Sequence, residues 1–151
     1  MDRYLYLSHL TDIKLWETNN PASLKVLLDE PLDLTDQRCE VALAQSILNT
    51  KTLPAGGFYI TVCCNLVDAQ TFPSNIVADH RAGTRFELQV LKVLAKEARG
   101  IGDIKERFYL PVIPTTYTRI DITLVPSEAS VQLETLMLDT LLCIHLRDVK
   151  G

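Results

Sequence analysis

Two side chains near the C-terminal end of the chain have types and spacing that could bind zinc. Cys143 and His145 are two positions apart, so in a β-strand they share one face. Thiolates and imidazoles are common zinc ligands, and Cys39 or Cys63 could supply a third. A partly buried pair in a strand is the other interpretation, and the three histidines of the chain include no His-x-His pair. We therefore predict no metal site and no cofactor.

A second candidate site is a group of acidic residues around Pro31. Asp29, Glu30, Asp33 and Asp36 could offer the several oxygen ligands that calcium prefers. Their spacing lacks the pattern of an EF-hand loop and the glycine that such a loop requires. A solvated acidic loop explains the same residues, and this is the interpretation that we expect.

The sequence contains no motif of a catalytic nucleophile or of a phosphate-binding loop. G-x-S-x-G, H-E-x-x-H, the P-loop and G-x-G-x-x-G are all absent. Asp139-Thr140 is followed by leucine, where an aspartic protease has glycine. The four cysteines form no C-x-x-C pair, so we expect free thiols that pack as small apolar groups in a reducing compartment. We predict no catalytic residue and no enzymatic activity.

The charge of the chain argues against a general nucleic-acid-binding protein. Its 151 residues include 15 Lys and Arg against 19 Asp and Glu, a net charge of −4. One stretch is basic, but the acidic residues within it leave a net charge of only +2, so we expect a solvated mixed surface and no nucleic-acid contact. The basic residues of this stretch are Lys92, Lys96, Arg99, Lys105 and Arg107.

We expect no segment that crosses a membrane and no secretion signal. The longest uncharged stretch, residues 52–67, is shorter than the ~20 residues that a bilayer requires and contains Pro54 and Gly56. The first residues lack the order of basic start, apolar run and small-residue cleavage site. The hydrophobic fraction of 47% is that of a folded globular domain.

Apolar residues recur with a period of two along most of the chain, which predicts short β-strands. In residues 39–49 we expect Val41, Leu43 and Gln45 on one face, with Ala42 and Ala44 on the other. The expected strands span residues 3–8, 23–29, 39–49, 58–67, 108–112, 119–125 and 141–147, while 131–138 fit either state.

Residues 86–99 give conflicting local signals. Thr84 and Glu87 form a capping-box pattern, and the Leu, Lys, Glu and Ala that follow favour a helix. The apolar run 88–94 is also compatible with a buried strand. With either assignment, about eight antiparallel strands with long connections predict an all-β sandwich or jelly roll, formed by a single domain over residues 1–151.

An ordered set of short segments runs through nearly the whole chain: Asn19, Pro21, Leu24, Val26, Leu28, Pro31, Leu32 and Leu34, then Cys39 to Leu43, Asn49-Thr50, YITVCCNLVDAQ, YLPVIPTTYTRIDITL and LLCIHLR. In this order the segments resemble the penton-type minor capsid proteins of the Polinton/Maverick and virophage-related DNA viruses. Departures from that pattern are Cys39 in place of a tryptophan, Thr71-Phe72-Pro73 in place of Val-Gly-Asp, and the lack of glycine in residues 136–139.

This resemblance implies a single jelly roll without a projecting insertion, in which residues 88–94 form a strand. It implies a structural protein of the virion that assembles as a homopentamer at the fivefold vertices of an icosahedral capsid. The implied partners are further copies of the chain and a major capsid protein of the double jelly-roll type. Assembly would take place in the nucleus or cytoplasm of the host.

Two other functions fit the same fold. One is a non-viral β-sandwich binding module, lectin-like or chaperone-like. The other is a metal enzyme, against which the scarcity of histidines argues. Trp16, Tyr4 and Tyr6 are candidate anchors of a protein interface, because aromatic residues are enriched at binding hot spots. Packing in the core is the alternative explanation for these three residues.

Connections in an antiparallel fold alternate between its two ends, which predicts how the loops gather. We expect loops 9–22, 49–56, 95–106 and 126–140 at one end, and loops 29–38, 68–85 and 113–116 at the other. One of the two sets should surround the fivefold axis of a pentamer.

Overall fold

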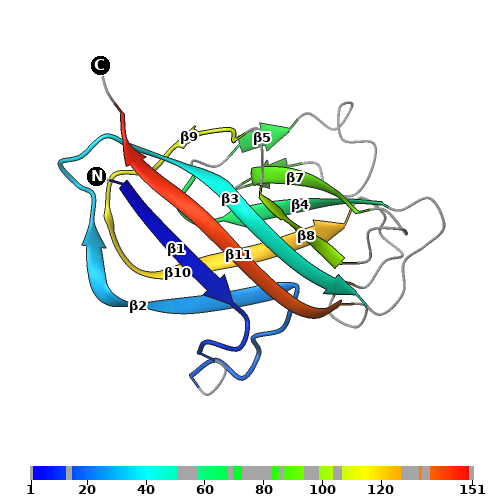
Figure 1. The fold of residues 1–151 in the computed structure, drawn as a ribbon. Helices are drawn as coiled ribbons and strands as arrows, with labels where there is room; N and C mark the ends of the chain where they lie inside the picture. Colours follow the sequence, from blue (N-terminus) through cyan, green and yellow to red (C-terminus); the bar gives the residue numbers. More distant parts are fainter. Residues whose placement is uncertain are drawn as a thin grey trace.

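The computed structural model of the chain consists almost entirely of β-strands (Figure 1). Among the residues that it describes, no helix is long and apolar enough to cross a membrane. The described residues are 2–12, 15–50, 58–67, 70–72, 83–85, 87–93, 99–103, 107–126, 133 and 137–149.

One layer of the fold is a five-stranded antiparallel sheet. Its strands follow the order β1 (Asp2–Ser8), β11 (Met137–Asp148), β3 (Cys39–Thr50) and β8 (Arg99–Asp103), and the short β9 (Leu110–Pro111) also pairs with β3. The first strand of the chain therefore lies beside the last, as Figure 1 shows.

The second layer is a four-stranded antiparallel sheet behind the first (Figure 1). Its order is β2 (Ser23–Asp33), β10 (Thr116–Pro126), β4 (Phe58–Cys64) and β7 (Glu87–Val93). A separate two-stranded ladder joins β5 (Gln70–Phe72) to β6 (Gly83–Arg85).

The chain crosses between the two sheets at most of its connections, which is the topology of a jelly roll. β1 and β3 belong to the five-stranded sheet, whereas β2 and β4 belong to the four-stranded sheet. After β7, the chain crosses again to β8, then to β10, and finally to β11. The predicted all-β jelly-roll fold is confirmed.

Alternating apolar residues of both sheets fill the space between the layers. On β10, Ile120, Ile122 and Leu124 face this core, while Arg119 and Thr123 are exposed. This alternation is the pattern expected of a strand with one buried face. The other principal members of the core are Leu24, Val26, Val41, Leu43, Ile60, Val62, Cys64, Leu66, Leu142, Ile144 and Leu146.

The helix that the local sequence favours in residues 86–99 is wrong. Residues 87–93 form strand β7, in which Leu91 pairs with Ile60 and Val93 pairs with Phe58 of β4. Pairing with a neighbouring strand outweighs the modest helix propensity of Leu, Lys and Glu. The strand that the family resemblance implies for residues 88–94 is therefore correct over 88–93, and residue 94 lies outside the described residues.

The face expected for Gln45 is also wrong. Cys143 pairs with Gln45 and the next residue, Ile144, pairs with Leu43, so Ala44 is an extra residue in β3. Such a β-bulge shifts the alternation of a strand by one position. Val41 and Leu43 therefore face the core as expected, whereas Gln45 is exposed.

The strand registers place the connections at two ends of the sandwich, as predicted. Thr50 at the end of β3 is opposite Met137, and Arg99 at the start of β8 is opposite Asn49. The β2–β3 connection lies at the other end, where Cys39 pairs with Asp148.

The loop boundaries themselves need correction. Range 95–106 contains β8 and range 29–38 contains the end of β2, because both segments pair with other strands. Range 68–85 contains β5 and β6, which pair with each other. The remainder of 68–85, and most of 49–56 and 126–140, lies outside the described residues.

Cys64 is a fully buried thiol of the core, between Val62 and Leu66 on the inner face of the β4 segment. Burial penalises its thiolate and raises the pKa of Cys64 from 9.0 to about 12. The unfolded chain therefore ionises this thiol at a lower pH than the folded protein does. The stability that the neutral thiol contributes is complete below pH 9 and is lost as the pH rises towards 12.

We expect Ile120→Ala to lower the free energy of unfolding by about 2–5 kcal/mol, because it opens a cavity at a fully buried position between the sheets. Urea unfolding followed by circular dichroism measures the change. The matched control is Thr123→Ala on the exposed face of the same strand, which should cost less than about 1 kcal/mol. Equal losses in the two variants would contradict the assignment of the two faces.

We expect the free energy of unfolding to fall more steeply above about pH 9 in the wild-type protein than in Cys64→Ala. The difference in slope should approach about 1.4 kcal/mol per pH unit, the value for one proton. Urea unfolding under reducing conditions at several pH values measures it. Cys63→Ala retains Cys64 and should keep the wild-type slope. A Cys64→Ala slope identical to that of the wild type would contradict the buried thiol.

Candidate functional site

The outer face of the five-stranded sheet carries a group of aromatic and charged side chains on β1 and β11. Leu5 packs against the core and Leu7 lies in it, so Tyr4 and Tyr6, which alternate with them along β1, point to the other face. In the β1–β11 ladder, Tyr4 is directly opposite His145. Side chains opposite each other on neighbouring strands are close enough to interact.

His145 is the centre of this group and is only 6% exposed. Its ring stacks on Tyr4, with ring centroids 4.4 Å apart. Its Nδ1 is 2.7 Å from the Tyr109 hydroxyl, and its Nε2 is 2.7 Å from Oδ1 of Asp2. Because a carboxylate only accepts, Nε2 carries the proton of the bond to Asp2. Both ring nitrogens are therefore occupied, and the imidazole is held in one orientation.

Residues 107–109, which precede β9, contact this face through two arginines. Nη1 of Arg107 donates to the Tyr4 hydroxyl at 3.3 Å. The Arg147 guanidinium lies 3.4 Å from the centroid of the Tyr109 ring, and its Nε donates to Oε1 of Glu40 at 2.7 Å. We call these residues the outer-face cluster: Asp2, Tyr4, Glu40, Arg107, Tyr109, His145 and Arg147.

Arg107 is a permanently charged member of the cluster. Hydrogen bonds to the hydroxyls of Tyr4 and Tyr109 raise its pKa further above the ordinary value of an arginine. Arg147 pairs with Glu40, but Arg107 forms no ion pair with a carboxylate among the described residues. Arg107 is therefore the arginine of the cluster that has no carboxylate partner among the described residues.

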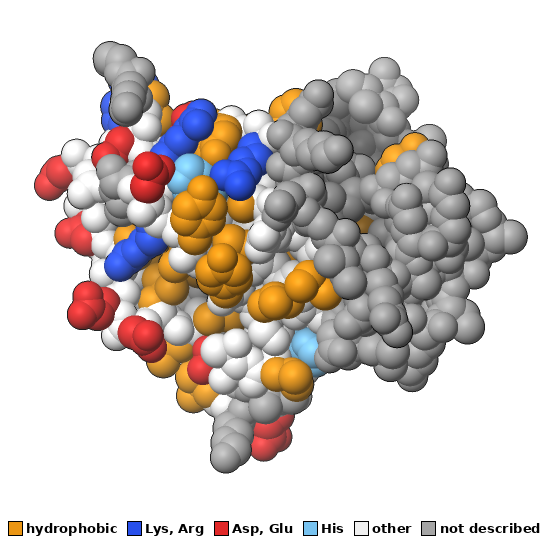
Figure 2. All heavy atoms as spheres, in the orientation of Figure 1, with side chains coloured by type: hydrophobic (Ala, Val, Ile, Leu, Met, Phe, Trp, Pro, Cys, Tyr) orange, Lys and Arg blue, Asp and Glu red, His pale blue; other side chains and the backbone are white. Residues whose placement is uncertain are grey.

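Exposed aromatic side chains belong to the cluster or are neighbours of its residues in the chain. Tyr4 is 48% exposed, Tyr6 62% and Phe108 57%. Figure 2 shows apolar side chains together with basic ones and a histidine on this side of the molecule. Core packing is therefore the wrong explanation for Tyr4 and Tyr6, whose exposure suits interface anchors, whereas Trp16 is half-buried.

The residues considered for zinc do not gather into one site. Cys143 is buried beside His145, and burial raises the pKa of its thiol. Cys63 belongs to β4 in the other sheet, and Cys39 lies at the far end of β3, opposite Asp148. Within the described part of the chain, no group of three or more His, Cys, Asp or Glu side chains could hold a metal ion.

The acidic residues considered for calcium are all exposed. The carboxylate of Asp33 accepts hydrogen bonds from the backbone N–H and the hydroxyl of Thr35 and from the hydroxyl of Thr116. The Thr35 hydroxyl is the main cause of the lowered pKa of Asp33. This carboxylate therefore fastens the end of β2 to the start of β10, which is a structural role.

The basic stretch is divided between the two sheets. Lys92 belongs to β7 and Arg99 to β8, which lie in different layers, while Arg107 belongs to the outer-face cluster. Lys96 and Lys105 lie outside the described residues. The nearness of these residues in the sequence thus does not define one basic surface.

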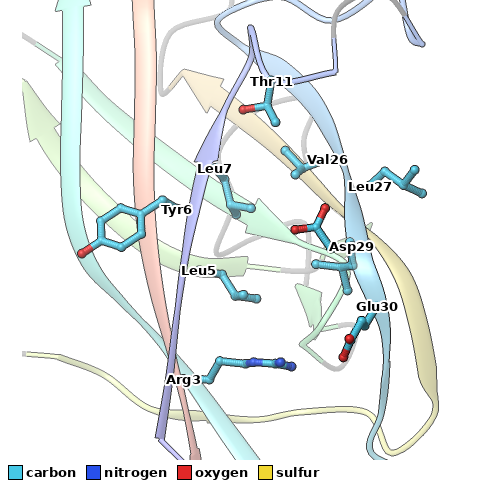
Figure 3. Close-up of a pocket in the computed structure, with 10 residues that line it drawn as sticks. Arg3, Leu5, Tyr6, Leu7, Thr11, Val26, Leu27, Asp29 and Glu30 are labelled. Carbon is cyan, nitrogen blue, oxygen red and sulfur yellow. The ribbon is translucent and has the colours of Figure 1, made fainter.

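A groove of about 460 Å³ separates the edge strands β1 and β2. Figure 3 shows Leu5 and Leu7 of β1 directed towards β2, while Tyr6 points away. Asp29 and Glu30 of β2 line the same groove. Its β1 wall thus carries the apolar Leu5 and Leu7 together with Arg3, which Figure 3 shows extending towards β2, while part of its β2 wall is acidic.

Sequence reasoning missed most of the outer-face cluster. Asp2, Glu40, Tyr109 and Arg147 were not singled out, because they come from segments that are distant in the chain and carry no motif. The available signal is the alternation of the first and last strands. It places Tyr4 and Tyr6 on one face of β1, and His145 and Arg147 on one face of β11.

Comparisons with known proteins identify the fold. No protein-family model and no curated protein matches the chain. Among solved structures, the mavirus penton protein is similar over 99% of this chain and 100% of that chain, with a TM-score of 0.55 and 9% sequence identity. The structure of infectious bursal disease virus, Gx strain, aligns with 97% of this chain and 31% of that chain, with a TM-score of 0.32 and 13% identity. The chain therefore shares the fold of the mavirus penton protein, as the resemblance of its sequence to penton-type proteins implies.

Proposed function

We propose that this protein is a structural component of a viral capsid, and specifically a penton-type minor capsid protein that forms homopentamers at the fivefold vertices. The observation that carries this proposal is the end-to-end match with the mavirus penton protein, which covers nearly all of both chains. The similarity thus extends over a whole subunit and not only over a shared core.

The surface of the molecule supports a role in assembly. Exposed tyrosines and arginines are typical of protein interfaces, where they combine a large contact area with hydrogen bonding. Here Tyr4 and Arg107 are already held in position by hydrogen bonding and ring contacts within the subunit. A surface that is ordered before contact loses little side-chain entropy when a partner binds.

A ring of identical subunits requires two different contact surfaces on each copy. Such a heterologous contact closes when each subunit is rotated by about 72° from its neighbour, which gives five copies. The sandwich of two sheets offers separate faces and edges for this purpose. The outer rim of the ring would then contact the major capsid protein of the double jelly-roll type.

Native mass spectrometry of the purified protein tests the pentamer. The subunit mass is 17.0 kDa, so five copies give about 85 kDa. We expect this species, and we expect it to increase with protein concentration, because assembly follows mass action.

A uniform dimer or trimer would contradict the vertex pentamer. A protein that stays monomeric at every concentration would contradict it as well. Glycan binding by such a monomer would favour the lectin-like function instead. A marker protein with a mass similar to that of the expected pentamer is the control, because it shows that species of this size are detected.

A further inference from the structure

We infer that neighbouring subunits of the proposed pentamer join through two named surfaces: the face around Arg107 of one copy and the acidic margin of β2 on the next. This inference rests on the proposed pentamer and specifies how it closes. We call the first surface the arginine–tyrosine face, formed by Tyr4, Tyr6, Arg107 and Phe108. We call the second the acidic edge, formed by Asp29, Glu30, Asp33 and Asp36.

The arginine–tyrosine face combines apolar area with the positive charge of Arg107. Tyr6 and Phe108 each expose more than half of their surface. Arg107 lies 5.7 Å from the Tyr4 ring centroid and bonds to its hydroxyl, yet it pairs with no carboxylate among the described residues. A partner that supplies carboxylates next to an apolar contact would therefore satisfy this face.

The acidic edge offers those carboxylates. Asp29, Glu30 and Asp36 are exposed and form no ion pair with another described residue. Asp33 is already engaged by the hydroxyls of Thr35 and Thr116, so it contributes charge more than new bonds. Arg3 of β1 lines the same groove as Asp29 and Glu30, and Arg38 follows Asp36 in the chain. Four carboxylates against these two arginines leave the edge a net charge of −2.

The two surfaces lie on adjacent sides of one subunit. The arginine–tyrosine face belongs to the outer side of the five-stranded sheet, whereas β2 is an edge strand of the other sheet. Figure 2 shows acidic side chains along one margin of the view, with apolar and basic side chains gathered inside that margin. In a five-membered ring, the directions from one subunit to its two neighbours differ by about 108°, which requires adjacent contact surfaces.

Because the two surfaces differ, one subunit can bind one neighbour through its arginine–tyrosine face and the other neighbour through its acidic edge at the same time. Opposite charges would set the register and accelerate association, while Tyr6 and Phe108 would supply most of the buried apolar area. Such a contact weakens as salt screens the charges. The occupant to which we commit is therefore another copy of this chain.

Charge reversal tests the contact, with the pentamer fraction in native mass spectrometry as the readout. We expect Arg107→Glu to reduce the pentamer at least about tenfold at fixed concentration, because like charges then face each other. The paired variant Asp29→Lys/Glu30→Lys should cause a similar loss. Combining all three substitutions in one chain should restore the ring, since every contact then joins opposite charges again. Circular dichroism confirms that each variant is folded.

Two further variants keep the test decisive. Phe108→Glu changes the same face without touching the hydrogen bonds of Arg107, and it should also reduce the pentamer. The matched control is Arg119→Glu, an exposed arginine on the outer face of the other sheet, which should leave the ring intact.

The outcomes separate this inference from the function on which it rests. A wild-type pentamer that Arg107→Glu and Phe108→Glu leave unchanged would overturn the contact and preserve the proposed function. Loss of the ring in Arg119→Glu alone would move the contact to the other sheet. A wild-type protein that forms no pentamer would overturn the proposed function together with the contact.

Discussion

The pairing of β1 with β11 is the contact on which the rest of the structure depends. It joins Asp2 to Arg147 and Ser8 to Leu141, so the two extremes of the described chain form one continuous ladder. β11 in turn pairs with β3, which makes the last strand an inner strand of its sheet. Contacts this distant in sequence close a long loop, and the entropy of that closure opposes the pairing until the core is packed.

The same ladder creates the outer-face cluster. Because Tyr4 is opposite His145, the two rings stack, and Asp2 reaches the imidazole from the start of the same strand. Tyr109 then binds the other ring nitrogen from a segment that is distant in the chain. A histidine whose two nitrogens are both bonded acts as a structural joint and not as a free base or ligand. The cluster is therefore suited to holding a surface in shape.

Sequence periodicity was sufficient wherever a strand has one buried face and no irregularity. In residues 60–66 and 119–125 the inward apolar positions are those that form the core, and of the outward positions only Thr61 is also buried. The bulge at Ala44 could not be predicted, because an extra residue is defined only against the partner strand. Residues 87–93 were ambiguous because their helical signals are local, whereas their pairing with β4 is not. The cluster was missed for a related reason: its members are scattered along the chain and meet only after folding.

The distribution of polar groups in the outer-face cluster is compatible with the assembly that we propose. The His145 ring is hydrogen-bonded to Tyr109, and Arg147 is hydrogen-bonded to Glu40. These donors and acceptors are therefore already used within the subunit. The groups left over are Arg107, whose charge is unpaired among the described residues, and exposed aromatic rings. In contact with water, these groups contribute little to stability. They contribute favourably to the free energy of binding when a partner covers the rings and supplies a carboxylate to Arg107. A contact built on charge and moderate apolar area favours correct register over extreme affinity, and subunits that bind incorrectly can then separate before a ring closes.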